Sequence, residues 1–474
     1  MSIKIALPKG RLLAETNALL SQAGWGLGGY HEKARLYRLR SEAFPGLSAK
    51  IFNERDIPVQ VAIGNYDLGI CGLDWVDELL VKYPSSTMVT VRDLGYGEGA
   101  LHTVGSNLGR AISSLEEVCS RTDVIRIASE YPNLAESWAL KLRLKRFSIF
   151  SLWGGAEAYP PEGAELALIP GRRGQKLFGY GLVSWDEVKS YRAVLIANRD
   201  SWETKGLGRL QASLEDVLAS GDWCPPPAEV TGASLANKPY LSRETDEGVV
   251  WLALPDGHQQ QPTVSLLNKA GIQIDDYPSA SGNRRPVANL DGVAVKVIRP
   301  QDMPLQEANG NFDLAITGRD WIREHLYQFP SSPVAELLDL KFGRVKLVAV
   351  ISQGVAVSDI EGLRRLSEGQ PKPLRVASEY VNIADKYARD NHLGMYRIVP
   401  TWGASEAFLP EDADLLIENT QTGRTLAKHN LKIIDTLGES SACLIGNSRG
   451  VFSDAKKARM DAIVSALRTV VEGV

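Results

Sequence analysis

The sequence predicts an α/β protein with largely parallel sheets, built as two copies of one module. Short apolar runs typical of buried strands alternate with stretches of helical periodicity along the 474 residues. The first run, 3–7, precedes leucines that share one helix face, and this helix is expected to end at Gly24. Further buried strands are predicted at 68–71, 125–128, 148–152 and 193–197. Such alternation is typical of sheets covered by helices.

The two halves of the chain repeat one another at a nearly constant spacing. Leu7-Pro8 recurs as Leu254-Pro255, and the segment Ala-Ser-Glu-Tyr at 128–131 recurs at 377–380. Trp153 likewise recurs as Trp402. Chance matches would not keep the same spacing along a whole unit, so we interpret the chain as a tandem duplication.

This duplication predicts three segments. They are a first module over 1–222, a proline-rich linker over 223–247 and a second module over 248–474. The linker begins with three consecutive prolines, which cannot continue a helix or donate to a β-ladder, so a semi-extended connector is expected. Because the repeat is far longer than those of solenoids, each module is expected to fold on its own core.

The composition argues against several classes of protein. The 53 Lys and Arg against 57 Asp and Glu give a formal net charge of −4, without the basic excess of a nucleic-acid or anionic-membrane binder. No stretch predicts a signal peptide or a membrane span. The four cysteines form no CxxC pair and the six histidines lack ligand spacing, so neither a disulfide framework nor a zinc site is expected. We therefore expect a reduced, cytoplasmic protein.

The strongest local motif lies in the second module, at 414–426. An apolar strand ends in Glu418 and enters a Thr/Gly loop that opens a helix. Gly423 permits close approach of the backbone to a ligand, Thr422 and Thr425 supply hydroxyl donors, and helix-start N–H groups favour a phosphate. A carboxylate before such a loop can accept hydrogen bonds from a sugar diol. The pattern suits a phosphoribosyl group, and a threonine-capped strand-turn-helix fits it equally well.

A second motif opens the first module. Lys9 and Arg11 flank Gly10 where the first predicted strand hands over to a helix. Two cations in this position suit the oxygens of pyrophosphate or a triphosphate. Two solvated cations on a surface turn would give the same pattern.

Taken in order, these motifs resemble the short form of the catalytic subunit of ATP phosphoribosyltransferase. The resemblance runs through the LPKGRL start, Asp56-Ile57-Pro58, the strands at 67–72 and 313–318, and the segments 126–133, 402–407, 418–426 and 440–441. It implies that each module has two lobes, similar to a type II periplasmic binding protein, with the active site in the cleft between them. It also implies a reaction that joins N1 of ATP to C1 of phosphoribosyl pyrophosphate with Mg²⁺ present and releases pyrophosphate.

The resemblance assigns roles to residues of this chain. Catalysis would rest on Glu418, Asp320 and Arg299. Phosphoribose would be held by Asp414, Glu418, Thr422, Gly423, Arg424 and Thr425. ATP or pyrophosphate would be held by Lys9, Arg11, Arg299, Lys346 and Glu406. Mg²⁺ is the expected cofactor, and no side chain is expected to bind it directly.

The two modules diverge from the family pattern in complementary ways. Ile169, Arg173 and Lys176 of the first module stand where the second has Glu418 and its two loop threonines. Asn53 and Ala100 likewise replace the cations Arg299 and Lys346. The first module is therefore not expected to hold phosphoribosyl pyrophosphate in the family's manner.

The start of the module diverges in the opposite direction. Lys9 and Arg11 become Asp256 and His258 in the second module. With His neutral, this removes two positive charges and adds a negative one. A unit charge 4 Å from a phosphate is worth about 4 kcal/mol at an effective dielectric constant of 20, so the change should matter in a phosphate pocket.

Three arrangements fit this divergence. In the first, one composite site combines Lys9 and Arg11 with the loop of the second module. In the second, the second module works alone with another cation, such as Arg319 or Arg344. In the third, the chain is an inactive protein that binds a nucleotide or another ligand. The duplication supplies a pseudo-dimer, and a further homo-oligomer or a synthetase-like regulatory subunit is a possible partner.

Overall fold

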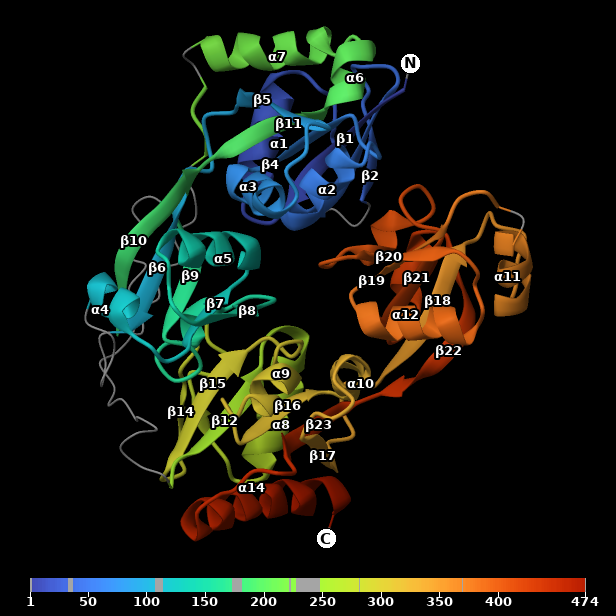
Figure 1. Cartoon of the computed structure of the whole chain (residues 1–474). Coiled ribbons are helices and arrows are strands. Elements are labelled where there is room, and N and C mark those ends of the chain that lie inside the picture. Colours follow the sequence, from blue (N-terminus) through green and yellow to red (C-terminus); the bar gives the residue numbers. More distant parts are fainter. Residues whose placement is uncertain are drawn as a thin grey trace.

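The computed structural model describes residues 2–32, 37–106, 114–172, 181–220, 223–226, 248–280, 282–368 and 370–473. Most of the predicted linker lies outside these residues, as do Arg173 and Lys176. The described chain forms four sheets, two in each half, arranged as four lobes (Figure 1). None of its helices has the length and apolar character needed to cross a bilayer.

The first lobe contains a six-stranded sheet in the order β2-β3-β1-β4-β11-β5. Its strands are β1 (Ile3–Lys9), β2 (Arg38–Arg40), β3 (Leu47–Asn53), β4 (Leu68–Gly72), β5 (Met88–Asp93) and β11 (Ala193–Asn198). Its helices are α1 (Leu13–Gln22), α2 (Ile57–Ala62), α3 (Leu73–Lys82), α6 (Arg199–Thr204) and α7 (Gly208–Ala219). β1 pairs in parallel with β3 and β4, whereas β11 runs antiparallel to β4 and β5.

The second lobe contains a five-stranded sheet in the order β10-β6-β9-β7-β8. Its strands are β6 (Gly99–Ser106), β7 (Ile125–Ser129), β8 (Phe147–Ser151), β9 (Leu166–Arg172) and β10 (Leu182–Tyr191), with helices α4 (Leu115–Ser120) and α5 (Pro132–Lys141). The chain enters this lobe from β5 and returns along β10 into β11 (Figure 1). The returning strand joins the first sheet in the opposite direction, so the sheets are mixed and the expectation of largely parallel sheets is corrected.

The second module repeats this order. Its first sheet contains β12 (Val250–Pro255), β13 (Ile274–Asp275), β14 (Val287–Ala288), β15 (Val293–Ile298), β16 (Leu314–Gly318), β17 (Val334–Asp339) and β23 (Ala442–Asn447). Its second sheet contains β18 (Val345–Ser352), β19 (Leu374–Ser378), β20 (Tyr396–Pro400), β21 (Leu415–Thr420) and β22 (Leu431–Ser440). The helices are α8 (Gln260–Lys269), α9 (Met303–Ala308), α10 (Arg319–Gln328), α11 (Ile360–Glu368), α12 (Val381–Asp390), α13 (Arg424–Lys428) and α14 (Asp454–Glu472).

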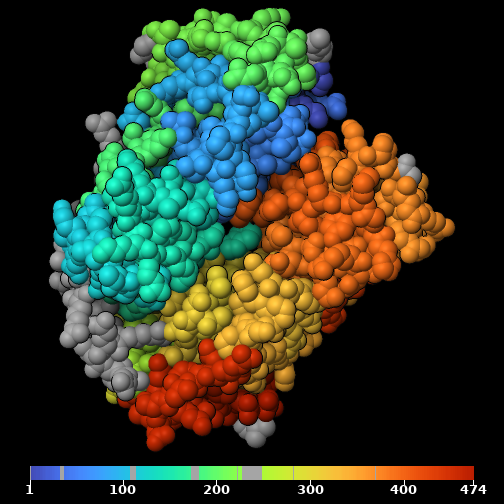
Figure 2. Space-filling model, viewed as in Figure 1, coloured from blue at the N-terminus to red at the C-terminus, as the bar shows by residue number. Residues whose placement is uncertain are grey.

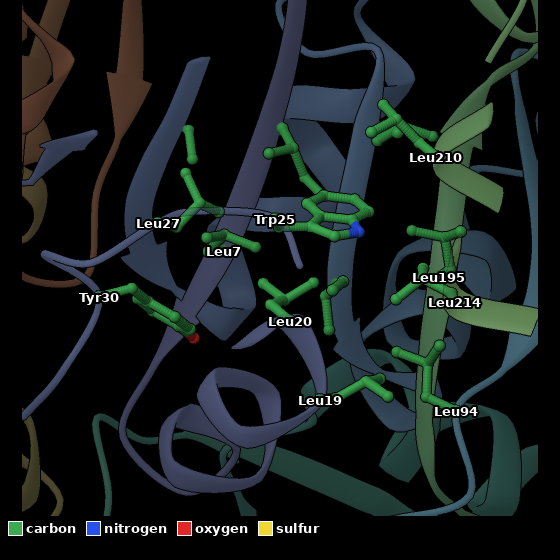
Figure 3. Packing of buried hydrophobic residues seen from close by; sticks show 14 of the residues in the cluster. Leu7, Leu19, Leu20, Trp25, Leu27, Tyr30, Leu94, Leu195, Leu210 and Leu214 are labelled. Carbon is green, nitrogen blue, oxygen red and sulfur yellow. The ribbon is translucent and has the colours of Figure 1, made fainter. Parts of the chain in front are cut away.

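The helix predicted after the first strand is confirmed. Leu19 and Leu20 of α1 pack against strands of the first sheet and against α7 (Figure 3). The helix ends one turn before Trp25, and Gly24 adopts the left-handed conformation with φ of 69°. The Trp25 indole is fully buried in this cluster and donates a hydrogen bond to the Ser213 hydroxyl.

Each module has hydrophobic clusters of its own, as expected, and two further clusters are shared between the modules. One shared core packs Phe52 and Tyr66 of the first module against Phe408 and Leu416 of the second. A second shared core joins 104–182 of the first module to 249–445 of the second. The first lobe of each module therefore packs on the second lobe of the other, and the space-filling view shows the blue and orange lobes in contact (Figure 2).

Equivalent ion-pair clusters cross the two module interfaces. Glu162 accepts from Lys296 at 2.6 Å and from Arg285 at 2.9 Å. The equivalent Glu411 accepts from Lys50 at 2.9 Å and from Arg38 at 3.0 Å. Glu162 is 3% exposed whereas Glu411 is 37% exposed. The same ion-pair cluster is therefore buried at one interface and partly exposed to water at the other.

We expect Glu162→Gln to destabilise the chain by roughly 3 kcal/mol, because it removes the carboxylate that pairs with a buried lysine. The matched variant Glu411→Gln should lower the stability by about 1 kcal/mol or less, because the Glu411 carboxylate is partly exposed to water. Lys50 also retains its ion pair with Asp412 at 2.7 Å in that variant. Urea unfolding at neutral pH measures both. Equal losses of stability in the two variants would contradict this difference between the interfaces.

Candidate active site

A cavity of about 510 Å³ lies between the two lobes of the second module. One lobe contributes Asp256, Arg299 and Asp320 to its lining. The other lobe contributes Glu379, Glu406 and the loop that follows β21. The cleft predicted between lobes is therefore present in the module that keeps the Thr/Gly loop.

The loop after β21 forms one wall of this cavity. Thr422, Arg424 and Thr425 line it, and Gly423 begins α13 in the left-handed conformation with φ of 69°. The Gly423 N–H group donates to the hydroxyl of Thr420, which closes the turn. Because α13 has only five residues, hydroxyls and Arg424 must contribute more to anion binding than the helix dipole.

Glu418 lies at the base of the loop with its carboxylate held on both sides. It accepts a hydrogen bond from the Ser405 hydroxyl and another from the Asn419 N–H group at 2.9 Å. Burial raises the pKa of Glu418 well above its ordinary value, and the nearby carboxylates of Glu379 and Glu406 raise it further. The arrangement fixes Glu418 in the cavity wall, as the sequence predicts.

Glu379 is a cavity residue that sequence reasoning did not select. It follows β19, and the Gly403 N–H group donates to its carboxylate. Burial, with help from the charges of Glu406 and Asp320, raises the pKa of Glu379 to about 7, and the Gly403 hydrogen bond opposes this rise. The sequence contains one indication of this role, because Glu379 lies in the Ala-Ser-Glu-Tyr segment that both modules repeat.

Asp320 lies across the cavity at the start of α10. The Ser440 hydroxyl donates to its carboxylate at 2.7 Å, and the Tyr380 hydroxyl also donates to it. Ser440 therefore positions a site residue as well as packing before β23. Trp321 stacks on Tyr380 at a centroid distance of 4.4 Å, and it also lines the cavity.

The change from Lys9 to Asp256 is accompanied by a second change. Arg284 of the second module pairs with Asp256 at 2.6 Å, and the equivalent residue in the first module is Tyr37. In the first module Lys9 lies over the Tyr37 ring, 5.4 Å from its centroid. The second module therefore has an aspartate–arginine pair where the first module has a lysine–tyrosine pair. Arg299 also contacts Asp256 at 3.3 Å, so the new negative charge is neutralised locally.

Lys9 and Arg11 do not line the cavity. The Arg11 guanidinium lies between Glu54 at 3.1 Å and Asp74 at 2.7 Å in the first module. His258 and Pro300 stand at the positions equivalent to Arg11 and Glu54, so Asp320 has no such arginine over it. Neither cation lines this cavity, although the Tyr37 ring beneath Lys9 stacks on His429 at the end of α13, at a centroid distance of 5.3 Å. The composite arrangement stays a prediction.

Three other predicted cations lie outside the cavity lining. Arg319 pairs on the surface with Glu336 and Asp339, and it was one candidate to replace the lost pair. Lys346 is exposed on β18, where it lies opposite Thr420 in the strand register, and Arg344 is also exposed. Among the described lining residues the arginines are Arg299 and Arg424.

Asp414 does not belong to the site, and this prediction is corrected. It lies just before β21, at the end of the strand opposite to the loop, where its carboxylate accepts from Arg375 at 2.9 Å. Arg126 and Glu165 form the equivalent pair in the first module at 2.6 Å. Because both modules keep the pair and only one keeps the loop, it is a structural ion pair.

Comparisons with known proteins identify the family of the chain. A family model described as ATP phosphoribosyltransferase matches residues 53–219 and again 299–469. The ATP phosphoribosyltransferase of Saccharolobus solfataricus is 34% identical over 214 residues, which cover 43% of this chain and 66% of that protein. The one from Pyrobaculum aerophilum is 36% identical over 212 residues, or 44% of this chain and 68% of that protein. The chain thus spans about two thirds of the length of such relatives.

The solved ATP phosphoribosyl transferase (HisG:HisZ) complex from Thermotoga maritima is also similar. Its matching chain is 20% identical with a TM-score of 0.39, and the match covers 48% of this chain and 100% of that one.

We expect the free energy of unfolding of Glu379→Gln to rise relative to that of the wild type as the pH increases. A carboxyl with a raised pKa favours folding below its unfolded value of 4.5, and this contribution is lost as the pH rises through about 7. Glutamine cannot ionise, so the stability difference from wild type should grow by roughly 2 kcal/mol between about pH 5 and pH 8.5. Denaturant unfolding across this range measures it.

The matched control is Glu439→Gln, which changes an exposed glutamate of β22. It should leave the stability difference from wild type nearly independent of pH. A flat pH dependence for Glu379→Gln would show that this carboxyl ionises normally.

Proposed function

The chain belongs to the ATP phosphoribosyltransferase family, and we propose that it forms phosphoribosyl-ATP from ATP and phosphoribosyl pyrophosphate, the first step of histidine biosynthesis. The reaction would take place in the cavity of the second module. The observation that carries this proposal is the 418–426 loop, which lines a cavity between two lobes with Glu418 fixed at its base. The repeated match to the family supports it.

The loop would hold the phosphoribosyl group. The hydroxyls of Thr422 and Thr425 and the guanidinium of Arg424 line the cavity where a phosphate would sit. The Glu418 carboxylate, already held by Ser405 and Asn419, would accept hydrogen bonds from the ribose diol.

The bond changes require charge stabilisation rather than a nucleophile from the protein. The lone pair of adenine N1 forms a bond to C1 of the ribose, and the C1–O bond breaks with its electrons going to pyrophosphate. Arg299 lines the opposite wall and would stabilise the negative charge that develops on the leaving group. Glu379, with a pKa of about 7, would accept the proton that the adenine amino group loses as N1 is substituted.

Mg²⁺ would enter with the substrate. In the described part of the chain, no group of three or more His, Cys, Asp or Glu side chains is arranged to hold a metal ion. Mg²⁺ commonly keeps several waters and binds substrate phosphates with one or two carboxylates, so a complex with pyrophosphate oxygens suits this cavity. Its contribution would be to neutralise phosphate charge near the acidic lining.

We propose that the reaction takes place in the cytoplasm and is controlled by a separate subunit. The four cysteines are free thiols, with Cys71 and Cys443 buried, which supports a reducing compartment such as the cytoplasm. A separate regulatory subunit of the synthetase-like type would supply feedback control. Mixing the purified chain with such a subunit and measuring inhibition by histidine would test this part.

The central test is phosphoribosyl-ATP formation by the purified chain with ATP, phosphoribosyl pyrophosphate and Mg²⁺. We expect turnover by the wild type and a loss of about 100-fold or more in Glu418→Gln, because glutamine replaces one of the two oxygens that would accept from the ribose diol with an amide donor. Lys9→Ala should retain turnover within a few-fold, because Lys9 lies outside the cavity.

The two variants separate the remaining arrangements. Loss of turnover in both would support a site that combines the modules. No turnover by the wild type would contradict the proposed activity and favour a binding protein.

A further inference from the structure

Residues of the first module hold a segment of the second module that lines the cavity. The segment is 402–406, which follows β20 and begins with Trp402. Asn53 donates from its side-chain amide to the Trp402 carbonyl at 2.9 Å. The Trp402 N–H group donates to the buried carboxylate of Asp56. Both backbone groups of Trp402 are therefore satisfied by the other module.

Arg55 contacts the side chain of the same tryptophan. Its guanidinium lies over the Trp402 ring, 4.1 Å from the ring centroid, and 5.6 Å from that of Trp75. Burial lowers the pKa of Arg55, and the charges of Glu78 and Asp56 oppose this effect. A cation over a tryptophan face is the favourable geometry for a cation–π contact, and it is stronger when water is excluded.

The residues that follow Trp402 in this segment either line the cavity or donate hydrogen bonds to its carboxylates. The Gly403 N–H group donates to Glu379, and Ala404 adopts the left-handed conformation with φ of 56°. Ser405 donates to Glu418, and Glu406 lines the cavity. A shift of Trp402 would therefore displace the groups that fix both Glu379 and Glu418.

The opposite interface lacks this arginine. There the Trp153 N–H group of the first module donates to Asp302 at 3.1 Å, as Trp402 does to Asp56. The residues equivalent to Asn53 and Arg55 are Arg299 and Gln301. The side-chain oxygen of Gln301 is buried without a hydrogen-bond partner. The cation over the tryptophan is thus present at the interface that supports the module with the intact loop.

We propose that Arg55 is a positioning residue of the first module that holds the 402–406 segment in its active geometry for the cavity of the second. The inference rests on the proposed phosphoribosyl transfer for its kinetic consequence. The first module has lost its own Glu and Thr residues for phosphoribose, and Arg55 gives it a role in the site of its neighbour.

The test compares Arg55→Gln, which introduces the residue found at the equivalent position 301, with Arg55→Lys, which keeps a cation over the ring. Hydrogen exchange of the 402–406 amides and steady-state kinetics are measured on the full chain. We expect Arg55→Gln to speed exchange in this segment at least tenfold and to lower kcat about tenfold with a smaller change in KM. Arg55→Lys should recover most of both effects.

The matched control is Arg199→Gln, which removes a surface arginine of the first module that is 45% exposed and pairs with Glu203. It should change neither exchange nor kinetics. Unchanged exchange and kcat in Arg55→Gln would overturn the proposal, as would equal losses in the lysine variant. Thermal unfolding identifies a variant that fails to fold, and Arg55→Lys then decides the question.

The two proposals can fail separately. A wild type that forms no phosphoribosyl-ATP contradicts the activity, while faster exchange at 402–406 in Arg55→Gln still supports the positioning role. A wild type that turns over, with Arg55→Gln equal to it in exchange and kcat, contradicts the positioning role alone.

Discussion

The packing of each first lobe on the second lobe of the other module is the constraint on which the rest of the structure depends. Phe52 and Phe408 meet edge to face at a centroid distance of 5.3 Å inside one shared core, and no single module contains both rings. A module alone would expose these apolar faces to water. The duplication therefore does more than provide a second copy of a site, because each copy completes the core of its neighbour.

This packing also places residues of each module against a cleft-lining segment of the other. The segments 153–157 and 402–406 each lie against the opposite module, so substitutions in one copy act on the cleft of the other. In the proposed site, Asn53 and Arg55 of the first module would support the second through Trp402, although the first module lacks the Glu and Thr residues of the loop. In the first module Arg11 pairs instead with Glu54 and Asp74.

The cavity of the second module has an acidic character that its chemistry must accommodate. Glu406 raises the pKa values of both Glu379 and Glu418, and Glu379 raises that of Glu418 as well. Raised pKa values are frequent at functional sites, where a carboxyl near neutrality can accept or hold a proton. The Lys9–Tyr37 pair carries one positive charge and the Asp256–Arg284 pair carries none, so Arg284 offsets part of the charge lost at this position.

The duplication, the α/β class, the helix that ends just before Gly24 and the choice of Glu418, Thr422 and Thr425 as site candidates all follow from the sequence alone. These features depend on local periodicity, turn chemistry and spacing, which are written in contiguous residues. Only the tertiary structure decided that the sheets are mixed, that Asp414 pairs with Arg375 far from the loop, and that Lys9 lies outside the cavity. It also selected Glu379 and Arg55, because their roles depend on Gly403 and Trp402, which are distant in sequence and are brought near by packing between lobes and modules.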